Sequence, residues 1–356
     1  MKRRSSSSLV LPALALALLS ASCTGEEAAL VHEAATSADD PGQSPNRDAG
    51  STPEAGPLDE CTDCHDEVTA EWSASAHRAA FTNDLFQNEW QLHRDPWCVR
   101  CHAPAADASA PAGVAATEGI SCAVCHVIGG VIVSSRVSGE APHEVRADPS
   151  FASEAQCAKC HSVAFPPSVR VAPGQALQDT ISEWQRSGAP GPCQDCHMPV
   201  VPSEGPHRSH LFPGARDEAL LSRSLRVTAS ARCVNGRTRV ALLLEAGAVG
   251  HDVPTGDVFR RLEVSASLRA RPATRVLRNL ERRFAVGRDG LVRQSADERV
   301  PVGGAREVEL VLSGCGELVD WSVDWLALDP TVADERAIPE QDARRRVARG
   351  RIRVTP

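Results

Sequence analysis

The sequence predicts two unlike domains: a mostly helical and irregular one over residues 58–220, and an all-β sandwich over residues 221–356. Three observations predict this division. Five copies of one short cysteine–histidine motif lie between residues 61 and 197, and none follows. Proline and glycine are frequent over the same stretch, which limits its helices to short pieces. After about residue 220, apolar and polar residues alternate with a period of two, which is typical of half-buried strands.

The repeated motif is CxxCH, and its copies are CTDCH (61–65), CVRCH (98–102), CAVCH (122–126), CAKCH (157–161) and CQDCH (193–197). Cysteine pairs alone would also suit structural zinc or a redox dithiol. A histidine directly after every second cysteine is instead the attachment signature of c-type haem. With 12 histidines in 356 residues, five coincidences are not expected. The sequence therefore predicts five covalently bound c-type haems.

The spacing suits this chemistry, because cysteines three residues apart lie about one helical turn apart and reach the two vinyl groups of one porphyrin. The following histidine then lies beneath the iron as its proximal ligand. The expected attachment residues are Cys61, Cys64, Cys98, Cys101, Cys122, Cys125, Cys157, Cys160, Cys193 and Cys196, and the expected proximal ligands are His65, His102, His126, His161 and His197. Only 7 Phe, 6 Trp and no Tyr are present, so we expect porphyrins to fill much of this domain's core.

A second axial ligand distinguishes an electron-carrying haem from a catalytic one, whose sixth position stays open. Lysine and methionine are nearly absent outside the leader and the motifs, so histidine is the main candidate. The candidates outside the motifs and the N-terminal segment are His77, His93, His143, His207, His210 and His251. Six candidates for five irons favour two histidine ligands at most haems. The count is also compatible with one open haem.

The C-terminal third shows strand patterns. Residues 225–231 alternate apolar and polar side chains, and residues 262–268 do so again. Asn235 and Gly236 between two such runs predict a hairpin turn. Cys233 and Cys315 remain after the haem cysteines and Cys23 are assigned, and an even remainder in an oxidising compartment favours a disulfide, with two buried thiols as the alternative.

The N-terminus predicts export. Residues 2–4 are basic, residues 9–19 form an apolar run too short to span a bilayer, and small residues lead to Cys23. Residues 1–22 are therefore expected to be a signal peptide and Cys23 a lipidated cysteine, with a plain cleavage site as the alternative. Residues 23–57 are rich in Pro, Gly, Ser and acids and are expected to form a disordered tether. This predicts a protein on the periplasmic or cell-surface side, lipid-anchored to the outer membrane.

A family resemblance follows from these motifs. CTDCHDEVTAEWSASAH (61–77) resembles the opening of multihaem c-type cytochromes related to the tetrahaem electron carrier of ammonia-oxidising bacteria. EGISCAVCH resembles a haem site of that group, and CQDCHMP followed by HRSHLFPG resembles its last haem site. The resemblance covers about residues 58–215. It implies that His77 and one of His207 and His210 are distal ligands, to haems that need not be the nearest in sequence.

The loop GHDVPTGD (250–257) resembles GHxxPTG loops in β-domains that follow haem domains in this family. The resemblance implies that His251 reaches back to a haem as a distal ligand. The alternative is a turn histidine that is hydrogen-bonded to the backbone.

Composition and missing motifs narrow the function. A net charge of −8 disfavours nucleic acid as a partner. Ammonia-forming nitrite reductases typically carry CxxCK and an active-site tyrosine, and hydroxylamine oxidoreductases crosslink a haem to tyrosine; this chain has neither CxxCK nor Tyr.

We therefore expect a pentahaem cytochrome c that carries electrons between other redox proteins of the cell envelope, with no catalytic residue. One alternative is a reductase of a small nitrogen or sulfur species at one open haem. Another is a binding subunit whose β-domain docks a larger redox complex.

Overall fold

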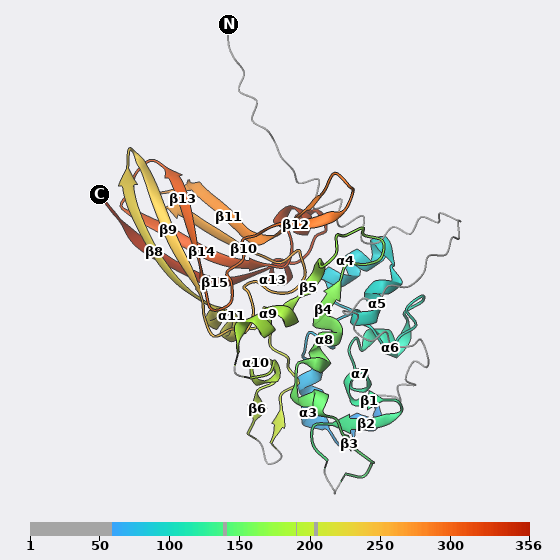
Figure 1. Ribbon diagram of the computed structural model, residues 1–356. Coiled ribbons are helices and arrows are strands. Elements are labelled where there is room, and N and C mark those ends of the chain that lie inside the picture. The colour runs from blue at the N-terminus through green and yellow to red at the C-terminus, as the bar shows by residue number, and fades with distance from the viewer. Residues whose placement is uncertain (1–58, 138–140, 190, 203–205) are drawn as a thin grey trace.

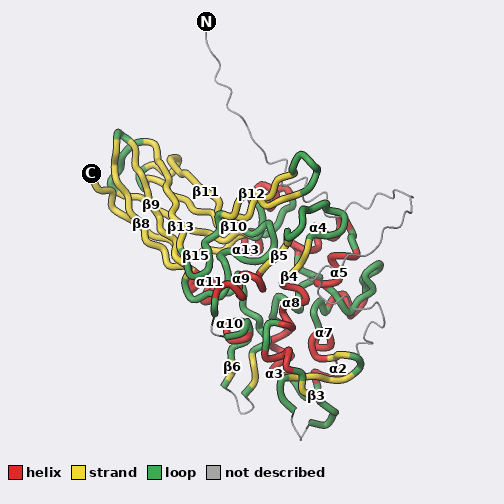
Figure 2. The backbone as a smooth tube through the Cα atoms, in the orientation of Figure 1, coloured by secondary structure: helices red, strands yellow, loops and turns green. Residues whose placement is uncertain are grey.

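The computed structural model describes residues 59–137, 141–189, 191–202 and 206–356. The expected signal peptide (1–22), the tether (23–57) and Cys23 lie outside the described residues. Within them, the chain forms two bodies that Figure 2 separates by colour: one holds short helices and long loops, the other a large sheet. No helix of the described residues is long and apolar enough to cross a membrane.

The N-terminal body is built from short elements joined by loops (Figure 1). Its helices are α2 (Asp59–Thr62), α3 (Asp66–Ser73), α4 (Asp84–His93), α5 (Pro96–His102), α6 (Gly113–Thr117), α7 (Cys122–His126), η1 (Pro149–Ala152), α8 (Ala155–His161), α9 (Thr180–Ser187), α10 (Gln194–His197) and α11 (Glu218–Ser224). Its strands are β1 (Val127–Ile128), β2 (Val131–Ser134), β3 (Arg146–Ala147), β4 (Ser162–Ala164), β5 (Ala176–Asp179), β6 (Val200–Val201) and β7 (His207–Arg208). These strands form only two- and three-stranded ribbons.

The C-terminal body is one eight-stranded sheet in the order β12-β11-β10-β14-β15-β8-β9-β13. Its strands are β8 (Leu225–Val234), β9 (Arg237–Ala246), β10 (Arg261–Leu268), β11 (Arg271–Val286), β12 (Val292–Asp297), β13 (Ala305–Ser313), β14 (Leu318–Leu326) and β15 (Arg344–Thr355). Two short helices, α12 (Pro330–Glu335) and α13 (Glu340–Ala343), connect β14 to β15.

The alternation in the sequence accounts for the strands at the start of this sheet. Along β9, every second residue from Thr238 to Ala246 is buried, and those between are more exposed. Asn235 and Gly236 have φ angles of 50° and 71°, as a tight hairpin turn between twisted strands requires. The predicted turn is therefore confirmed, and it sets the antiparallel register of β8 and β9.

A β-rich domain is present where an all-β sandwich was predicted, but its strands form one sheet rather than two packed antiparallel sheets. The long strand β15 pairs antiparallel with β14 along most of its length, and its last residues, Val354 and Thr355, pair parallel with β8. Strand β15 thereby joins one half of the sheet, β12-β11-β10-β14, to the other half, β8-β9-β13. The sheet is therefore continuous, and it curls. Apolar side chains of both halves then meet in one core, which includes Leu242 and Leu244 of β9 and Leu262 and Val264 of β10.

The N-terminal body has no comparable core. Its largest apolar cluster among the described residues gathers a few side chains of α4, α5 and nearby loops, such as Phe81, Phe86, Trp90 and Val99. This agrees with the scarcity of large apolar side chains in its sequence.

Candidate haem cavity and its axial ligands

One large cavity runs through the N-terminal body and reaches the β-domain. Its volume is about 3830 Å³, against about 300–1,000 Å³ for an ordinary small-molecule pocket. The cysteines and histidines of all five CxxCH motifs line it, and so do residues of the loop that contains His251. The cavity therefore has room for several large prosthetic groups, and the motif residues surround that space.

Local helical structure presents the motifs to the cavity. CVRCH, CAVCH and CAKCH lie within α5, α7 and α8, and the last four residues of CQDCH form α10. In the first motif, the backbone N–H of His65 donates to the carbonyl of Cys61 at 3.0 Å, which closes a helical turn. Residues three and four apart share one face of a helix. Each motif thus directs its two thiols and its imidazole to the same side.

Backbone carbonyls orient several imidazoles. The Nδ1 atoms of His102, His126 and His197 lie 2.8, 2.9 and 2.6 Å from the carbonyl oxygens of Ala80, Val133 and Pro213. An Nδ1–H that donates to a carbonyl leaves Nε2 as the unprotonated nitrogen. This is the arrangement commonly found in metal-bound histidines, where the other ring nitrogen fixes the orientation.

Two of the candidate distal histidines are held in the same way. Nδ1 of His210 lies 2.8 Å from the carbonyl oxygen of Arg208, and Nδ1 of His251 lies 3.0 Å from that of Asp252. Their Nε2 atoms are therefore also suited to bind iron. His251 is hydrogen-bonded to the backbone, as the alternative of a turn histidine predicts. That bond uses Nδ1 and leaves Nε2 available to bind a metal.

Four motif histidines each face a second histidine at nearly the same distance. The centroid separations are 6.5 Å for His65–His143, 6.4 Å for His77–His161, 6.3 Å for His126–His210 and 6.4 Å for His197–His251. Two iron–nitrogen bonds of about 2 Å, with about 1.2 Å from each nitrogen to its ring centre, give about 6.4 Å. The residues present therefore fit haem with an imidazole on each side of the iron.

His102 is the exception, since no described histidine faces it at this separation. His93, at the end of α4, lies with Nε2 3.6 Å from a carboxylate oxygen of Glu89. His207 lies with Nε2 3.3 Å from Glu71. The ring of Phe86 stacks on that of His102, with centroids 3.9 Å apart. The six candidate distal histidines thus divide into four that face a motif histidine and two that contact carboxylates.

Burial keeps most of these imidazoles neutral. Burial is the largest cause that lowers the pKa of His77, to about 4, and the neighbouring histidines His161, His197 and His210 add to it. Burial also lowers the pKa of His126 and of His251. Only the neutral imidazole binds a metal, so a lowered pKa favours the ligating form.

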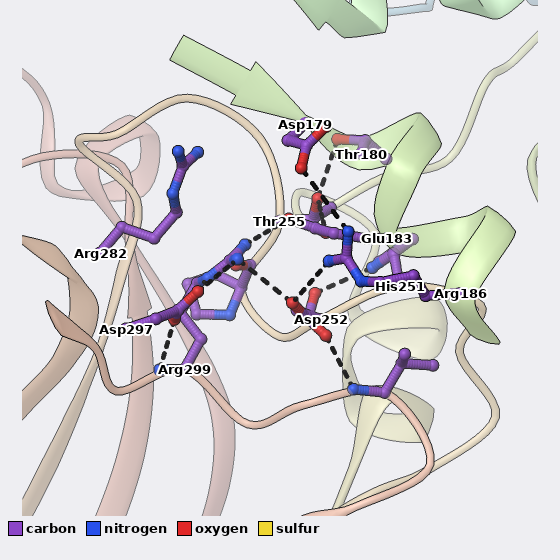
Figure 3. Close-up of polar contacts among 12 residues, drawn as sticks. Asp179, Thr180, Glu183, Arg186, His251, Asp252, Thr255, Arg282, Asp297 and Arg299 are labelled. Carbon is purple, nitrogen blue, oxygen red and sulfur yellow. Dashed lines mark hydrogen bonds and ion pairs between the residues drawn. The ribbon is translucent and has the colours of Figure 1, made fainter. Parts of the chain in front are cut away.

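A buried charge network joins the two bodies beside His251 (Figure 3). Arg299, which follows β12, points its guanidinium at Glu183 of α9 and at Asp252, with nitrogen–oxygen distances of 2.5 and 3.2 Å. Asp297 pairs with the same guanidinium at 2.8 Å. The hydroxyl of Thr255 donates to Glu183 at 2.6 Å.

The network holds the loop that carries His251. Glu183 is completely buried and Arg299 is 5% exposed, so each needs the other to offset the cost of burying its charge. Asp252, the residue after His251, also accepts the backbone N–H of Val302 at 2.8 Å. Sequence reasoning missed this network, because Glu183 and Arg299 are ordinary charged residues 116 positions apart.

The remaining cysteines are joined to each other. Cys233, in β8, and Cys315, after β13, form a disulfide with their Cα atoms 5.6 Å apart. The bond lies within the β-domain and ties an early strand to the end of a late one. It leaves the ten motif cysteines for haem.

Comparisons with known proteins agree with this description. The family "Cytochrome c554 and c-prime" matches residues 60–127, a segment that holds the first three CxxCH motifs. The fold is similar to that of a penta-heme cytochrome c552 from Thermochromatium tepidum, with a TM-score of 0.66 and 18% identity over 83% of this chain and 98% of that one. None of the curated proteins compared matches this sequence. The motifs, the family match and the shared fold together support a multihaem c-type cytochrome with covalently bound haem, which implies electron transfer with redox partners.

Proposed function

We propose that the protein is an exported pentahaem cytochrome c that relays electrons between redox partners of the cell envelope. The observation that carries this proposal is the set of four facing histidine pairs around one cavity. Haem iron with two imidazole ligands exchanges electrons without binding a substrate. The basic and apolar N-terminus, Cys23 and the polar stretch 23–57 support export and a lipid anchor on the outer membrane.

Each CxxCH motif would hold one haem, with its own histidine as the proximal ligand. The distal ligands would be His143 for the first motif, His210 for the third, His77 for the fourth and His251 for the fifth. In this pairing the distal ligand always comes from a different part of the chain, so each such haem crosslinks two segments. The fifth haem joins the N-terminal body to the β-domain.

Thiol contacts support a connected relay. The side chains of Cys101 and Cys160 lie close enough to shift each other's thiol pKa, and so do those of Cys157 and Cys193. These contacts bring the fourth motif against both the second and the fifth. Haems attached at neighbouring cysteines would have edges close together, which would favour rapid electron exchange. The haem of the fourth motif would then connect its two neighbours.

A second function is favoured by His102, which no described histidine faces. The haem of the second motif would keep an open position and could bind a small nitrogen or sulfur species for reduction. Electrons would reach it through the haem of the fourth motif, whose Cys160 contacts Cys101.

One experiment tests both functions. The mass of the mature protein gives the number of haems and shows whether Cys23 is lipidated. Electron paramagnetic resonance of the ferric protein, with carbon monoxide added to the ferrous form, gives the number of open irons. Four low-spin haems and one high-spin haem that binds carbon monoxide would support the reductase. Five low-spin haems without carbon monoxide binding would exclude the reductase and leave electron relay as the function. Fewer than five haems would refute the pentahaem proposal.

A further inference from the structure

A second cavity, of about 640 Å³, lies on the β-domain and shares no lining residue with the haem cavity. Its lining residues come from four neighbouring strands, β11, β10, β14 and β15 (Figure 1). Its volume falls within the range of about 300–1,000 Å³ that is usual for small-molecule sites. None of the residues assigned to haem takes part, so this cavity points to a separate function.

The floor of the cavity consists of small hydroxyl side chains on the outer face of the sheet. Val264 and Leu268 of β10 face the core, so Ser265 and Ser267 between them face outward. Ser265 is directly opposite Ser322 of β14, and the two hydroxyl oxygens lie 3.1 Å apart. Because these side chains are short, they leave a depression between the longer side chains on either side.

Arginines form the walls of this depression. Arg275 of β11 lies on one side, and the arginines of β15 on the other are Arg346, Arg349 and Arg351. Strands β11 and β15 are separated by β10 and β14. Three strand spacings give a width of about 14 Å. The guanidiniums therefore surround a space that is wide enough for more than one anionic group.

Two buried carboxylates hold part of these walls in place. Glu263 and Asp324 are directly opposite each other on β10 and β14, and they are only 3% and 1% exposed. Glu263 accepts from Arg275 at 2.6 Å, and Asp324 accepts from Arg346. Arg344 contacts both carboxylates, at 2.9 and 3.2 Å. Adjacent carboxylates would repel each other without these cations, so Arg275 and Arg346 are positioned before any ligand binds.

The wall arginines keep hydrogen-bond donors for a ligand. Arg346 and Arg351 each use Nε for a carboxylate of β14, so within the described chain both Nη groups of each remain for other acceptors. Arg275 uses Nη2 alone. The side chain of Arg349 has no hydrogen bond or ion pair in the part of the chain that the structure describes. Its guanidinium is therefore available to an anion.

The charge of the β-domain also favours an anion. Residues 221–356 contain 24 arginines and 18 acidic residues, although the whole chain has a net charge of −8. The four lining arginines contact three carboxylates, and the same carboxylates also pair with Arg269 and Arg344. Six arginines thus accompany three carboxylates, which leaves an excess of positive charge at the cavity.

We propose that this cavity binds a small molecule that carries two or more phosphate or carboxylate groups. Arg349 and Arg351 take one anionic group, since guanidiniums bind such groups through paired N–H donors. Arg275 takes another on the opposite wall. The hydroxyl of Ser267 lies between the walls and is a further donor. The width of the cavity selects a ligand with several anionic groups over a single phosphate ion. This site goes beyond electron relay and does not depend on it.

Isothermal titration calorimetry of the full-length, haem-loaded protein tests this with tripolyphosphate, citrate and inorganic phosphate as probes. Tripolyphosphate or citrate should bind saturably, with one molecule per chain, and about 10-fold or more tightly than inorganic phosphate. The tighter of the two shows whether phosphate or carboxylate is the preferred group. Arg349→Ala should weaken its binding about 10-fold, as expected for one charge-assisted hydrogen bond, and Arg349→Lys should recover part of the loss. Because Arg349 has no partner in the described chain, denaturant unfolding and the haem spectra should stay unchanged.

The matched control is Arg353→Ala, which removes an exposed arginine two residues beyond Arg351 on the same face of β15, outside the cavity. It should leave all three affinities unchanged. If Arg353→Ala weakens binding as much as Arg349→Ala, the probes respond to the general charge of the domain, and the inference fails. It also fails if neither tripolyphosphate nor citrate binds saturably, or if inorganic phosphate binds as tightly as they do. Each of these outcomes leaves the haem count and the electron relay untouched.

Discussion

The interiors of the two bodies of this protein are filled in opposite ways. The β-domain fills its centre with its own side chains, and many of them, such as Leu242, Leu262 and Leu312, are completely buried. The N-terminal body surrounds a cavity of about 3830 Å³ with cysteines and histidines instead. The core of the β-domain consists of apolar side chains, whereas the interior of the N-terminal body depends on bound prosthetic groups. Their stabilities should therefore respond to different changes.

The largest effect is expected when haem is withheld. A chain made without covalent haem should lose the N-terminal body altogether, because its few apolar clusters cannot offset the entropy of ordering its loops. The β-domain should stay folded, since its core contains only side chains. Hydrogen exchange measures this directly: amides of β9 and β10 should stay protected while those of α5, α7 and α8 exchange freely. Equal protection in both bodies would contradict the comparison.

The next largest effect is expected where the bodies meet. Arg299→Met leaves Glu183 buried without its partner, which costs about 3–5 kcal/mol in comparable ion pairs. The loop that carries His251 should then shift, and the haem of the fifth motif should become high-spin and bind carbon monoxide. The double variant Glu183→Gln with Arg299→Met should recover part of the stability, because the fully buried carboxylate is neutralised while Asp252 and Asp297 still lose their partner. Denaturant unfolding and paramagnetic resonance give the two readouts. An unchanged low-spin spectrum in Arg299→Met would show that the network does not hold His251.

Acid should affect the N-terminal body before the β-domain. Burial lowers the pKa of His77 from its usual 6.5 to about 4. Between these values the unfolded chain binds a proton that the folded chain refuses, so stability present above pH 6.5 is lost as the pH falls toward 4. Iron bound to His77 holds the imidazole deprotonated further, so the low-spin spectrum should be lost no earlier than the lower end of this window. Absorption spectra and β-domain circular dichroism, followed together from pH 7 to 4, test the order. A β-domain that unfolds first would reverse it.

The smallest effect is expected on the outer surface of the sheet. Arg239 and Glu309 are both about half exposed and lie 2.9 Å apart across β9 and β13. Solvent screens such a pair, so Arg239→Ala should cost at most about 1 kcal/mol. Denaturant unfolding should give this value with the haem spectra unchanged. A loss as large as that of Arg299→Met would mean that burial does not separate the two ion pairs.

The sequence was informative where the physics is local. The CxxCH spacing predicted the attachment residues, and the alternation around Asn235 and Gly236 predicted a hairpin that the structure confirms. Contacts between distant segments were not predictable in this way. No sequence pattern near His65 indicates that His143 faces it, and no pattern in β15 indicates that its last residues pair parallel with β8. Counting histidines gave six distal candidates, and only three-dimensional placement separates His93 and His207 from the rest.

The pairing of distant histidines also sets an order of events in time. With the ligands proposed above, His143 is made only after three haem motifs, and His251 only after all five. A chain that emerges N-terminus first during export would therefore present its haem motifs before the residues that close them. Early forms would hold exposed, five-coordinate irons that react with small ligands. Once the loop that carries His251 is in place, the iron of the fifth haem would no longer be exposed. A low-spin spectrum of the fifth haem would therefore report that the β-domain has folded.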